Sequence, residues 1–169
     1  MRTPFPEALV LRAERLLAAA RARDVRLATA ESCTGGLVAA LLTEIPGSSE
    51  VVERGFVTYS NAAKSEMLGV PADLIRRHGA VSPEVACAMA EGALVNSAAD
   101  FAVAVTGVAG PGGGSAAKPV GLVEFACAAR DGATILLTER YGDLGRSQIR
   151  LTAIATALSL FERAVGGAS

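Results

Sequence analysis

The sequence predicts an α/β fold, a three-layer α/β/α single domain built on a mixed, mostly parallel sheet. Short apolar stretches typical of strands alternate with longer stretches typical of helices, which is the order of a sheet covered on both faces. Late in the chain, two strand-like stretches at 120–129 and 134–141 are separated by Asp131-Gly132. This pair predicts a β-hairpin with a primed turn, and therefore at least one antiparallel pairing in the sheet.

The length favours one domain. A chain of 169 residues, 51% of them hydrophobic, is long enough to bury a core without disulfides or metal ions. No repeat or linker divides it, so we assign residues 1–169 to a single domain. Residues 1–24 form its N-terminal helical segment and residues 166–169 a frayed tail.

The first half of the chain alternates helices and strands. Apolar residues recur at helical spacing opposite Arg12 and Arg15 in the first segment, and Ser60 or Asn61 is placed to cap a later short helix. In order, the predicted elements are a helix at 6–23, a strand at 25–31, a helix from near Leu37 to about Glu44, a strand at 51–59 and a short helix at 61–68.

The second half begins with a strong helix signal, Ser82 followed by Pro83, and this helix is predicted to run through Val95. The predicted elements that follow are a strand at 101–106 covered on both faces, a glycine-rich loop at 107–118, the hairpin at 120–129 and 134–141, and a closing helix at 144–165.

Charge and hydropathy exclude several classes of protein. A net charge of -1 leaves no general positive field for nucleic acid. The longest apolar stretches, such as residues 37–42, are far shorter than the roughly 20 residues of a membrane span, and charged residues interrupt the N-terminal segment. We therefore expect a soluble, cytoplasmic protein that binds neither nucleic acid nor membrane.

Cysteine and histidine usage argues against a metal site. The three cysteines, Cys33, Cys87 and Cys127, are widely spaced, and His78 is the one histidine. These residues cannot supply the usual ligand spacing of zinc, so we expect no metal and no cofactor. His78 ends a helical stretch, where a capping histidine is common, and we prefer that interpretation over a place in a catalytic triad.

The first chemical cluster follows the first predicted strand. Ser32, Cys33 and Thr34 are all nucleophilic, and Gly35-Gly36 would let a ligand approach the backbone where the next helix begins. The alternative is that Ser32 or Thr34 only caps this helix and that Cys33 is a small buried residue.

The second set of candidate residues is the two lysines, which stand out from the count of basic residues. Of the 16 basic residues, 14 are arginine, and the two lysines are Lys64 and Lys118. A lysine can be neutralised by burial, whereas a guanidinium stays charged, so a retained lysine is a candidate base. The alternative is chance in a composition biased toward arginine.

The third cluster is the glycine-rich segment 106–115, directly after the buried strand. It lacks the lysine of a Walker loop and opens no helix, so it matches neither standard phosphate-binding loop. Its Gly-Pro and triple glycine suit close backbone approach to a ligand, although a plain connector is the alternative.

Taken together, these motifs resemble the CinA C-terminal domain family over about residues 27–150. The residues that carry the resemblance are Ala30-Glu31-Ser32-Cys33-Thr34-Gly35-Gly36, Gly55-Phe56-Val57-Thr58-Tyr59-Ser60-Asn61 with Lys64, Gly79-Ala80-Val81-Ser82, and Thr106-Gly107-Val108-Ala109-Gly110-Pro111 with Lys118-Pro119-Val120-Gly121. The family includes stand-alone nicotinamide-nucleotide amidohydrolases. The resemblance therefore implies deamidation of nicotinamide mononucleotide to nicotinate mononucleotide and ammonia.

The resemblance also implies the catalytic residues. Members of the family are thought to use a serine and a lysine with a nearby tyrosine, and Ser32, Lys64 and Tyr59 stand at the matching positions. Lys64 would act as base for Ser32, and Tyr59 would orient Lys64 or relay the proton. Lowering a lysine pKa from near 10.4 to about 7 requires roughly 4–5 kcal/mol of destabilisation of the charged form.

The substrate is expected to contact the first and third clusters and a late arginine. The family carries that arginine after a Gly-Asp pair. Here the corresponding stretch is Asp143-Leu144-Gly145-Arg146, so the arginine is present and the pair is displaced. The expected substrate-binding residues are Thr34, Gly35, Gly36, Asn61, Thr106, Gly107, Gly113, Gly114, Ser115 and Arg146.

Two other functions remain open at this point. One is a serine amidase or esterase that acts on another small amide. The other is a non-catalytic domain that binds a nucleotide-like ligand or a protein linked to competence or DNA damage. The weakly charged helix face at 151–160 also leads us to expect a homo-oligomer.

Overall fold

The sheet has five strands in the order β2-β1-β3-β4-β5 in the computed structural model, which describes residues 3–167. The strands are β1 (Leu27–Glu31), β2 (Val52–Val57), β3 (Phe101–Gly107), β4 (Leu122–Ala129) and β5 (Ile135–Arg140). β2, β1 and β3 are parallel, whereas β4 pairs antiparallel with both β3 and β5. The predicted mixed sheet is confirmed, with its parallel strands on one side and its antiparallel pairs on the other.

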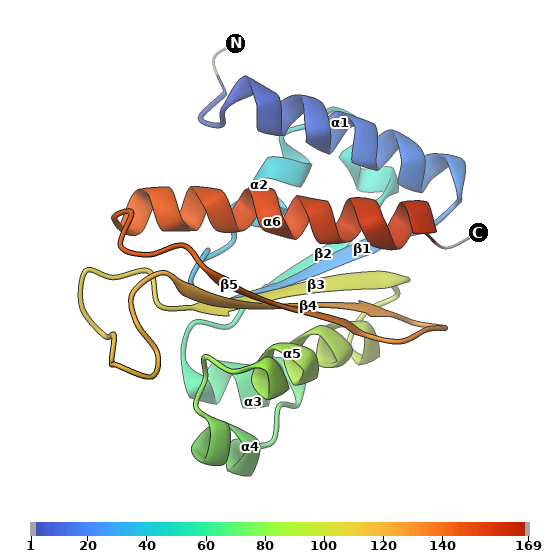
Figure 1. Ribbon diagram of the computed structural model, residues 1–169. Helices are drawn as coiled ribbons and strands as arrows, with labels where there is room; N and C mark the ends of the chain where they lie inside the picture. The colour runs from blue at the N-terminus through green and yellow to red at the C-terminus, as the bar shows by residue number, and fades with distance from the viewer. Residues whose placement is uncertain (1–2, 168–169) are drawn as a thin grey trace.

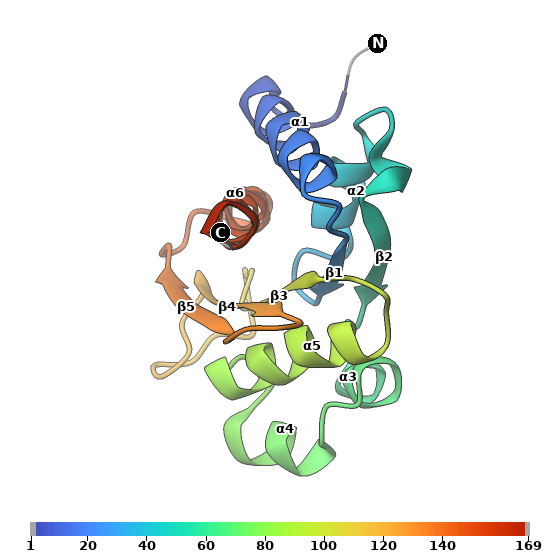
Figure 2. The ribbon, with the colours of Figure 1, turned by 90° about the vertical axis from the view of Figure 1, so that its right-hand side faces the viewer.

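Helices cover both faces of this sheet (Figure 1), which confirms the predicted three-layer α/β/α class. The helices of one face are α1 (Glu7–Ala22), α2 (Leu37–Thr43) and α6 (Arg146–Gly167). Those of the other face are α3 (Asn61–Leu68), α4 (Ala72–His78) and α5 (Pro83–Val95). Figure 2 shows α5 directly against the sheet and α4 outside it.

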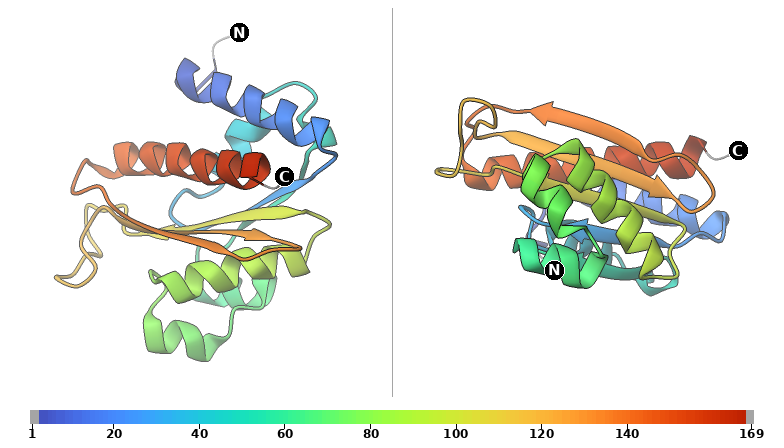
Figure 3. Two further views of the ribbon diagram at one scale, coloured as in Figure 1. Left: turned by 45° about the vertical axis from the view of Figure 1, so that its right-hand side comes forward. Right: turned by 90° about the horizontal axis from the view of Figure 1, so that it is seen from below.

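Side-chain alternation along the central strands divides the core in two. Leu27 of β1 and Val103 of β3 belong to the cluster that packs under α1, α2 and α6. Ala28 and Ala102, the neighbours of these two residues along their strands, belong to the cluster under α5. Alanine on that face leaves room for α5, which crosses the sheet in the view from below (Figure 3).

The α6 side of the core is built from larger groups. Leu158 and Phe161 are both fully buried there. Each contributes about 1.5–3 kcal/mol of hydrophobic stabilisation relative to an exposed position.

Within residues 3–167, no helix is both long and apolar enough to cross a membrane.

Most predicted elements are present, with shifted ends. The short 3-10 helix η1 (Ser48–Glu50) precedes β2, and α4 is a separate helix that ends at His78, where the sequence indicated only a helical stretch. α6 continues through Gly167 into the segment predicted as a frayed tail. Residues 1–2 of the predicted N-terminal segment and residues 168–169 of the tail lie outside the described residues.

The hairpin is confirmed, but the primed turn at Asp131-Gly132 is wrong. Five residues join β4 to β5, and neither Asp131 nor Gly132 has a positive φ, which a type I′ turn requires. The Gly132 N–H instead donates to the Ala129 carbonyl and closes a four-residue turn within a longer loop. The Arg130 guanidinium, which donates to the Leu94 and Ala99 carbonyls, ties this loop to the end of α5.

The connections determine where a ligand can bind. α2 leads from β1 to β2 over one face, whereas α3, α4 and α5 lead from β2 to β3 over the other (Figure 2). The chain therefore changes side between β1 and β3, and the carboxyl ends of these two strands face the same edge. In open α/β sheets this crevice is the usual ligand site.

Candidate active site

Ser32 and Lys64 meet at this edge of the sheet. Ser32 follows β1, and its backbone N–H donates to the Val105 carbonyl of β3 at 2.9 Å. Lys64 Nζ lies 3.0 Å from Ser32 Oγ and donates to the Thr58 carbonyl at 2.9 Å. The lysine side chain is 1% exposed, and burial lowers its pKa. The pair therefore has the geometry and electrostatics of a nucleophile beside a neutralisable base.

The start of α3 places Lys64. Ser60 Oγ accepts a hydrogen bond from the Ala63 N–H at 3.0 Å, so Ser60 is the residue that caps this helix. The helix is short and ends at Gly69, which has a left-handed conformation with φ of 68°. One turn after the cap, Lys64 is directed inward to the end of β1.

The turn after Ser32 is closed by backbone and side-chain bonds. The Gly35 N–H donates to the Ser32 carbonyl at 3.0 Å, and Gly35 and Gly36 both have positive φ values, which explains the glycine pair. The fully buried Glu31 carboxylate accepts from the Val38 and Ala39 N–H groups at 2.9 and 3.0 Å. A carboxylate at the start of α2 satisfies N–H groups that a helix leaves unpaired.

A pocket of about 200 Å³ opens beside the pair. Its lining residues are Ser32, Cys33, Tyr59, Asn61, Lys64, Ala80, Val81, Thr106, Gly107, Ala109 and Arg146. Seven of the predicted site residues are thus brought together, namely Ser32, Tyr59, Asn61, Lys64, Thr106, Gly107 and Arg146.

The other six predicted binding residues do not line this pocket. Thr34 is fully buried, and its hydroxyl donates to Glu31 at 2.7 Å. Gly35 and Gly36 form the turn behind Ser32. Gly113, Gly114 and Ser115 lie in the loop between β3 and β4, which extends beyond the sheet in Figure 1.

The Tyr59 hydroxyl bonds to Arg146 at the edge of the pocket. The Tyr59 side chain is 61% exposed, and its hydroxyl accepts a hydrogen bond from Arg146 Nη2 at 3.0 Å. Arg146 Nη1 also donates to the Gly110 carbonyl at 2.9 Å. The contact of Tyr59 with Lys64 is through its backbone carbonyl, 3.4 Å from Nζ. The tyrosine and the arginine together form the outer rim of the pocket.

Cys33 lies next to Ser32 but has the wrong electrostatics for a nucleophile. Burial raises the pKa of its thiol to about 12. Because the thiolate is the reactive form, this raised pKa disfavours Cys33 as a nucleophile at neutral pH.

The second lysine has a structural partner. Lys118 Nζ donates to the His78 carbonyl at the end of α4, so it ties the glycine-rich loop to the pocket wall. Thr106 Oγ1 donates to the Ala80 carbonyl at 2.9 Å and holds the same wall. Ala80 and Val81, which were not among the predicted site residues, also line the pocket.

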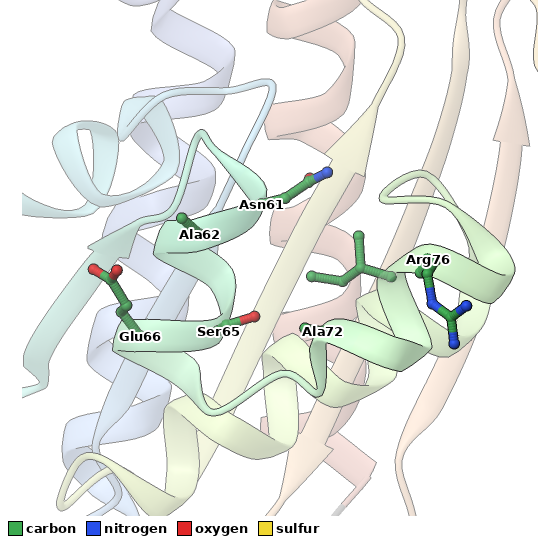
Figure 4. Close-up of a pocket in the computed structure, with 7 residues that line it drawn as sticks. Asn61, Ala62, Ser65, Glu66, Ala72 and Arg76 are labelled. Carbon is green, nitrogen blue, oxygen red and sulfur yellow. The ribbon is translucent and has the colours of Figure 1, made fainter.

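A larger hollow of about 390 Å³ lies between α3 and α4 and shares Asn61 with the smaller pocket. Figure 4 shows Asn61 and Ser65 projecting toward α4, whereas Glu66 projects from the opposite side of α3. Arg76 at its rim is paired with Asp73. This hollow contains no nucleophile beside a base, so the smaller pocket is the candidate active site.

Metal ligands do not gather in the described part of the chain. Across residues 3–167, no group of three or more histidine, cysteine, aspartate or glutamate side chains is placed to hold an ion.

Comparison with known proteins identifies relatives over most of the chain. The model of the CinA C-terminal domain matches residues 11–165. A CinA-like protein from Mycolicibacterium vanbaalenii is 55% identical over 141 residues, which cover 83% of this chain and 33% of that protein. A CinA-like protein from Akkermansia muciniphila is 60% identical over 112 residues, which cover 66% of this chain and 27% of that protein. The chain thus spans between about a quarter and a third of the length of these relatives.

One solved structure is similar to this chain over nearly the full length of both chains. The crystal structure of the competence/damage inducible protein CihA from Agrobacterium tumefaciens superposes with a TM-score of 0.95 at 52% identity and covers 98% of this chain and 99% of that one. The family match and this superposition agree with the resemblance seen in the sequence motifs. The chain belongs to the CinA C-terminal domain family.

Proposed function

We propose that this chain hydrolyses the carboxamide of nicotinamide mononucleotide and releases nicotinate mononucleotide and ammonia. The observation that carries the proposal is the 3.0 Å contact between Ser32 Oγ and the buried Lys64 Nζ. A domain that only binds a ligand gains nothing from a buried lysine beside a serine, because burying a charge is costly.

The first half of the reaction forms an acyl-enzyme. Neutral Lys64 takes the proton of Ser32 as Oγ attacks the carboxamide carbon and the carbonyl oxygen becomes an oxyanion. When the intermediate collapses, the C–N bond breaks and Lys64 returns the proton to the leaving nitrogen, which departs as ammonia. In the second half, water gives a proton to Lys64, attacks the ester and releases nicotinate mononucleotide and Ser32.

Backbone N–H groups beside the nucleophile would stabilise the oxyanion. Across residues 3–167, the Cys33 N–H donates to no backbone carbonyl, and Cys33 lines the pocket. In serine hydrolases of several folds, the residue after the nucleophile supplies such a donor. Arg146 at the rim would bind the substrate phosphate, for which a guanidinium is well suited.

The protonation of Lys64 gives the reaction a pH dependence. Burial lowers the pKa of Lys64, and only the neutral amine accepts the serine proton. Activity should therefore rise with pH through this lowered pKa and reach a plateau below the pKa of an exposed lysine.

Ammonia release from nicotinamide mononucleotide tests the proposal. Wild type is expected to turn over with EDTA present, and Ser32→Ala and Lys64→Met are expected to lose activity by about three orders of magnitude or more. Ser49→Ala, an exposed serine remote from the pocket, is the matched control and should keep wild-type activity. A folded wild type that releases no ammonia would contradict the proposal, and the same assay with other small amides would then test the broader amidase function.

A further inference from the structure

We infer that Arg150 of α6 is a positioning residue for the nucleophile, and this inference rests on the proposed serine–lysine function. Arg150 Nε donates to the Cys33 carbonyl at 3.1 Å, and its Nη2 donates to the Thr34 carbonyl at 3.2 Å. Cys33 and Thr34 directly follow Ser32, and they lie more than one hundred positions before Arg150 in the sequence. One guanidinium therefore holds the two carbonyls in the middle of the Ser32 turn.

The first of these bonds acts on the central peptide of the turn. The Gly35 N–H bonds to the Ser32 carbonyl, so residues 32–35 form a four-residue turn whose middle peptide joins Cys33 to Thr34. Turns of types I and II differ by a flip of this peptide. Arg150 holds the orientation in which the Cys33 carbonyl points toward α6.

Peptide planarity fixes the N–H of the same peptide as well. The carbonyl and N–H of one trans peptide point in opposite directions, so the Thr34 N–H points away from the Arg150 guanidinium. The preceding peptide of the turn carries the Cys33 N–H, and Cys33 lines the pocket. Arg150 thus fixes the turn that carries Ser32 and Cys33 without touching the substrate, since it does not line the pocket.

The other side of the turn is fixed independently. Glu31 accepts the Val38 and Ala39 N–H groups and the Thr34 hydroxyl, which holds the turn to the start of α2. Without Arg150 these bonds remain, so the segment stays folded while its central peptide is released. Loss of Arg150 should therefore reduce the reactivity of Ser32 more than it reduces stability.

Arg150 also stands one helical turn after Arg146 on α6, so the two guanidinium groups project on the same side of the helix. Arg146 reaches the rim at Tyr59, and Arg150 reaches the turn behind Ser32. The first turns of α6 therefore supply two arginines to the site. Arg146 lies at the substrate side, and Arg150 lies behind the nucleophile.

The test measures Ser32 reactivity by a route independent of the natural substrate. A fluorophosphonate forms a bond from Ser32 Oγ to phosphorus as fluoride leaves and Lys64 takes the serine proton. In Arg150→Met we expect the labelling rate and kcat for nicotinamide mononucleotide to fall on the order of 10- to 100-fold, with a much smaller change in KM. Arg150→Lys should be intermediate, because an ammonium lacks the planar fork, and added guanidinium should partly rescue Arg150→Met.

Arg163→Met is the matched control, because Arg163 is an exposed arginine on the same helix and should label at the wild-type rate. A folded Arg150→Met or Arg150→Lys variant that labels as fast as wild type would overturn the inference. If Arg150→Met does not fold, the labelling rate of Arg150→Lys relative to wild type tests the inference. A wild type that labels but does not release ammonia contradicts the proposed substrate alone, whereas a wild type whose Ser32 does not label overturns both proposals.

Discussion

Lys64 Nζ lies 3.0 Å from Ser32 Oγ, although 32 positions separate the two residues in sequence. The parallel pairing of β1 with β2 produces this contact, because the two strands end at the same edge and each is followed by one of the two residues. The partners of Lys64 are a hydroxyl and backbone carbonyls, and no acidic side chain is paired with it in the described structure. The charged form of Lys64 is thus left without a counter-ion.

Lys64→Met should abolish activity and also change how stability depends on pH. Because burial lowers the pKa of Lys64 in the folded state, the unfolded chain binds more protons between the folded and unfolded pKa values. Wild type therefore loses stability as the pH falls from the pKa of Lys64 in the unfolded chain, near 10.4, through its lower pKa in the folded protein. Urea denaturation from pH 6 to 10 should show Lys64→Met gaining stability relative to wild type toward the acid end of this range.

Ser32→Ala is the control for this experiment. It is also inactive but keeps the buried amine, so its stability should follow the pH dependence of wild type. Parallel stability curves for wild type and Lys64→Met would show that the lysine is not destabilised by burial.

Cys33→Ala should keep most of the wild-type activity. Burial raises the pKa of this thiol to about 12, so the thiolate is scarce at neutral pH even though the side chain borders the pocket. The loss of a small buried side chain should cost about 1 kcal/mol of unfolding free energy. Cys127→Ala, at a buried cysteine of β4 outside the pocket, is the matched control. If Cys33→Ala were as inactive as Ser32→Ala, the thiol would have a chemical role.

The fold was largely predictable because its signals are local. The apolar run of β3, the Ser82-Pro83 helix start and the Ser60 cap each depend on neighbouring residues, and all three are present in the structure. The primed turn failed because a distant contact decides that loop, namely the binding of Arg130 to the end of α5. A dipeptide pattern contains no information about that contact.

The site was predictable where side-chain chemistry itself was the signal. Ser32 and Lys64 stood out as a nucleophile after a strand and as one of two lysines. Glu31 and Arg150 were missed because most of their partners are backbone groups, which every residue has. Glu31 alone gave a hint, as an acidic residue at the end of a buried strand.

Arg146→Gln should weaken binding of a phosphorylated substrate and leave the chemical step nearly intact. Arg146 is at the pocket rim, bonded to Tyr59 and Gly110, and has no contact with Ser32 or Lys64 among the bonds of residues 3–167. Loss of a charge-assisted hydrogen bond costs about 1.5–3 kcal/mol, which corresponds to roughly a 10- to 150-fold rise in KM for nicotinamide mononucleotide. Nicotinamide riboside lacks the phosphate and should be turned over alike by variant and wild type. An equal loss on both substrates would place Arg146 in the chemistry instead.

Gly92→Ala should destabilise the protein and impair catalysis, although alanine is the better helix former by about 1 kcal/mol. Gly92 lies in α5 where α3 crosses it, and a Cβ there would stand 2.0 Å from the Leu68 carbonyl oxygen at the end of α3. The obstacle is backbone, so α3 must move as a unit and would carry Lys64 away from Ser32. Overpacking of this kind costs about 1–3 kcal/mol, so the urea midpoint and ammonia release should both fall. Gly112→Ala is the matched control, because a Cβ at Gly112 meets nothing within 4 Å, and it should leave both measurements near wild type. A Gly92→Ala variant as stable and active as wild type would mean that α3 can shift without displacing the lysine.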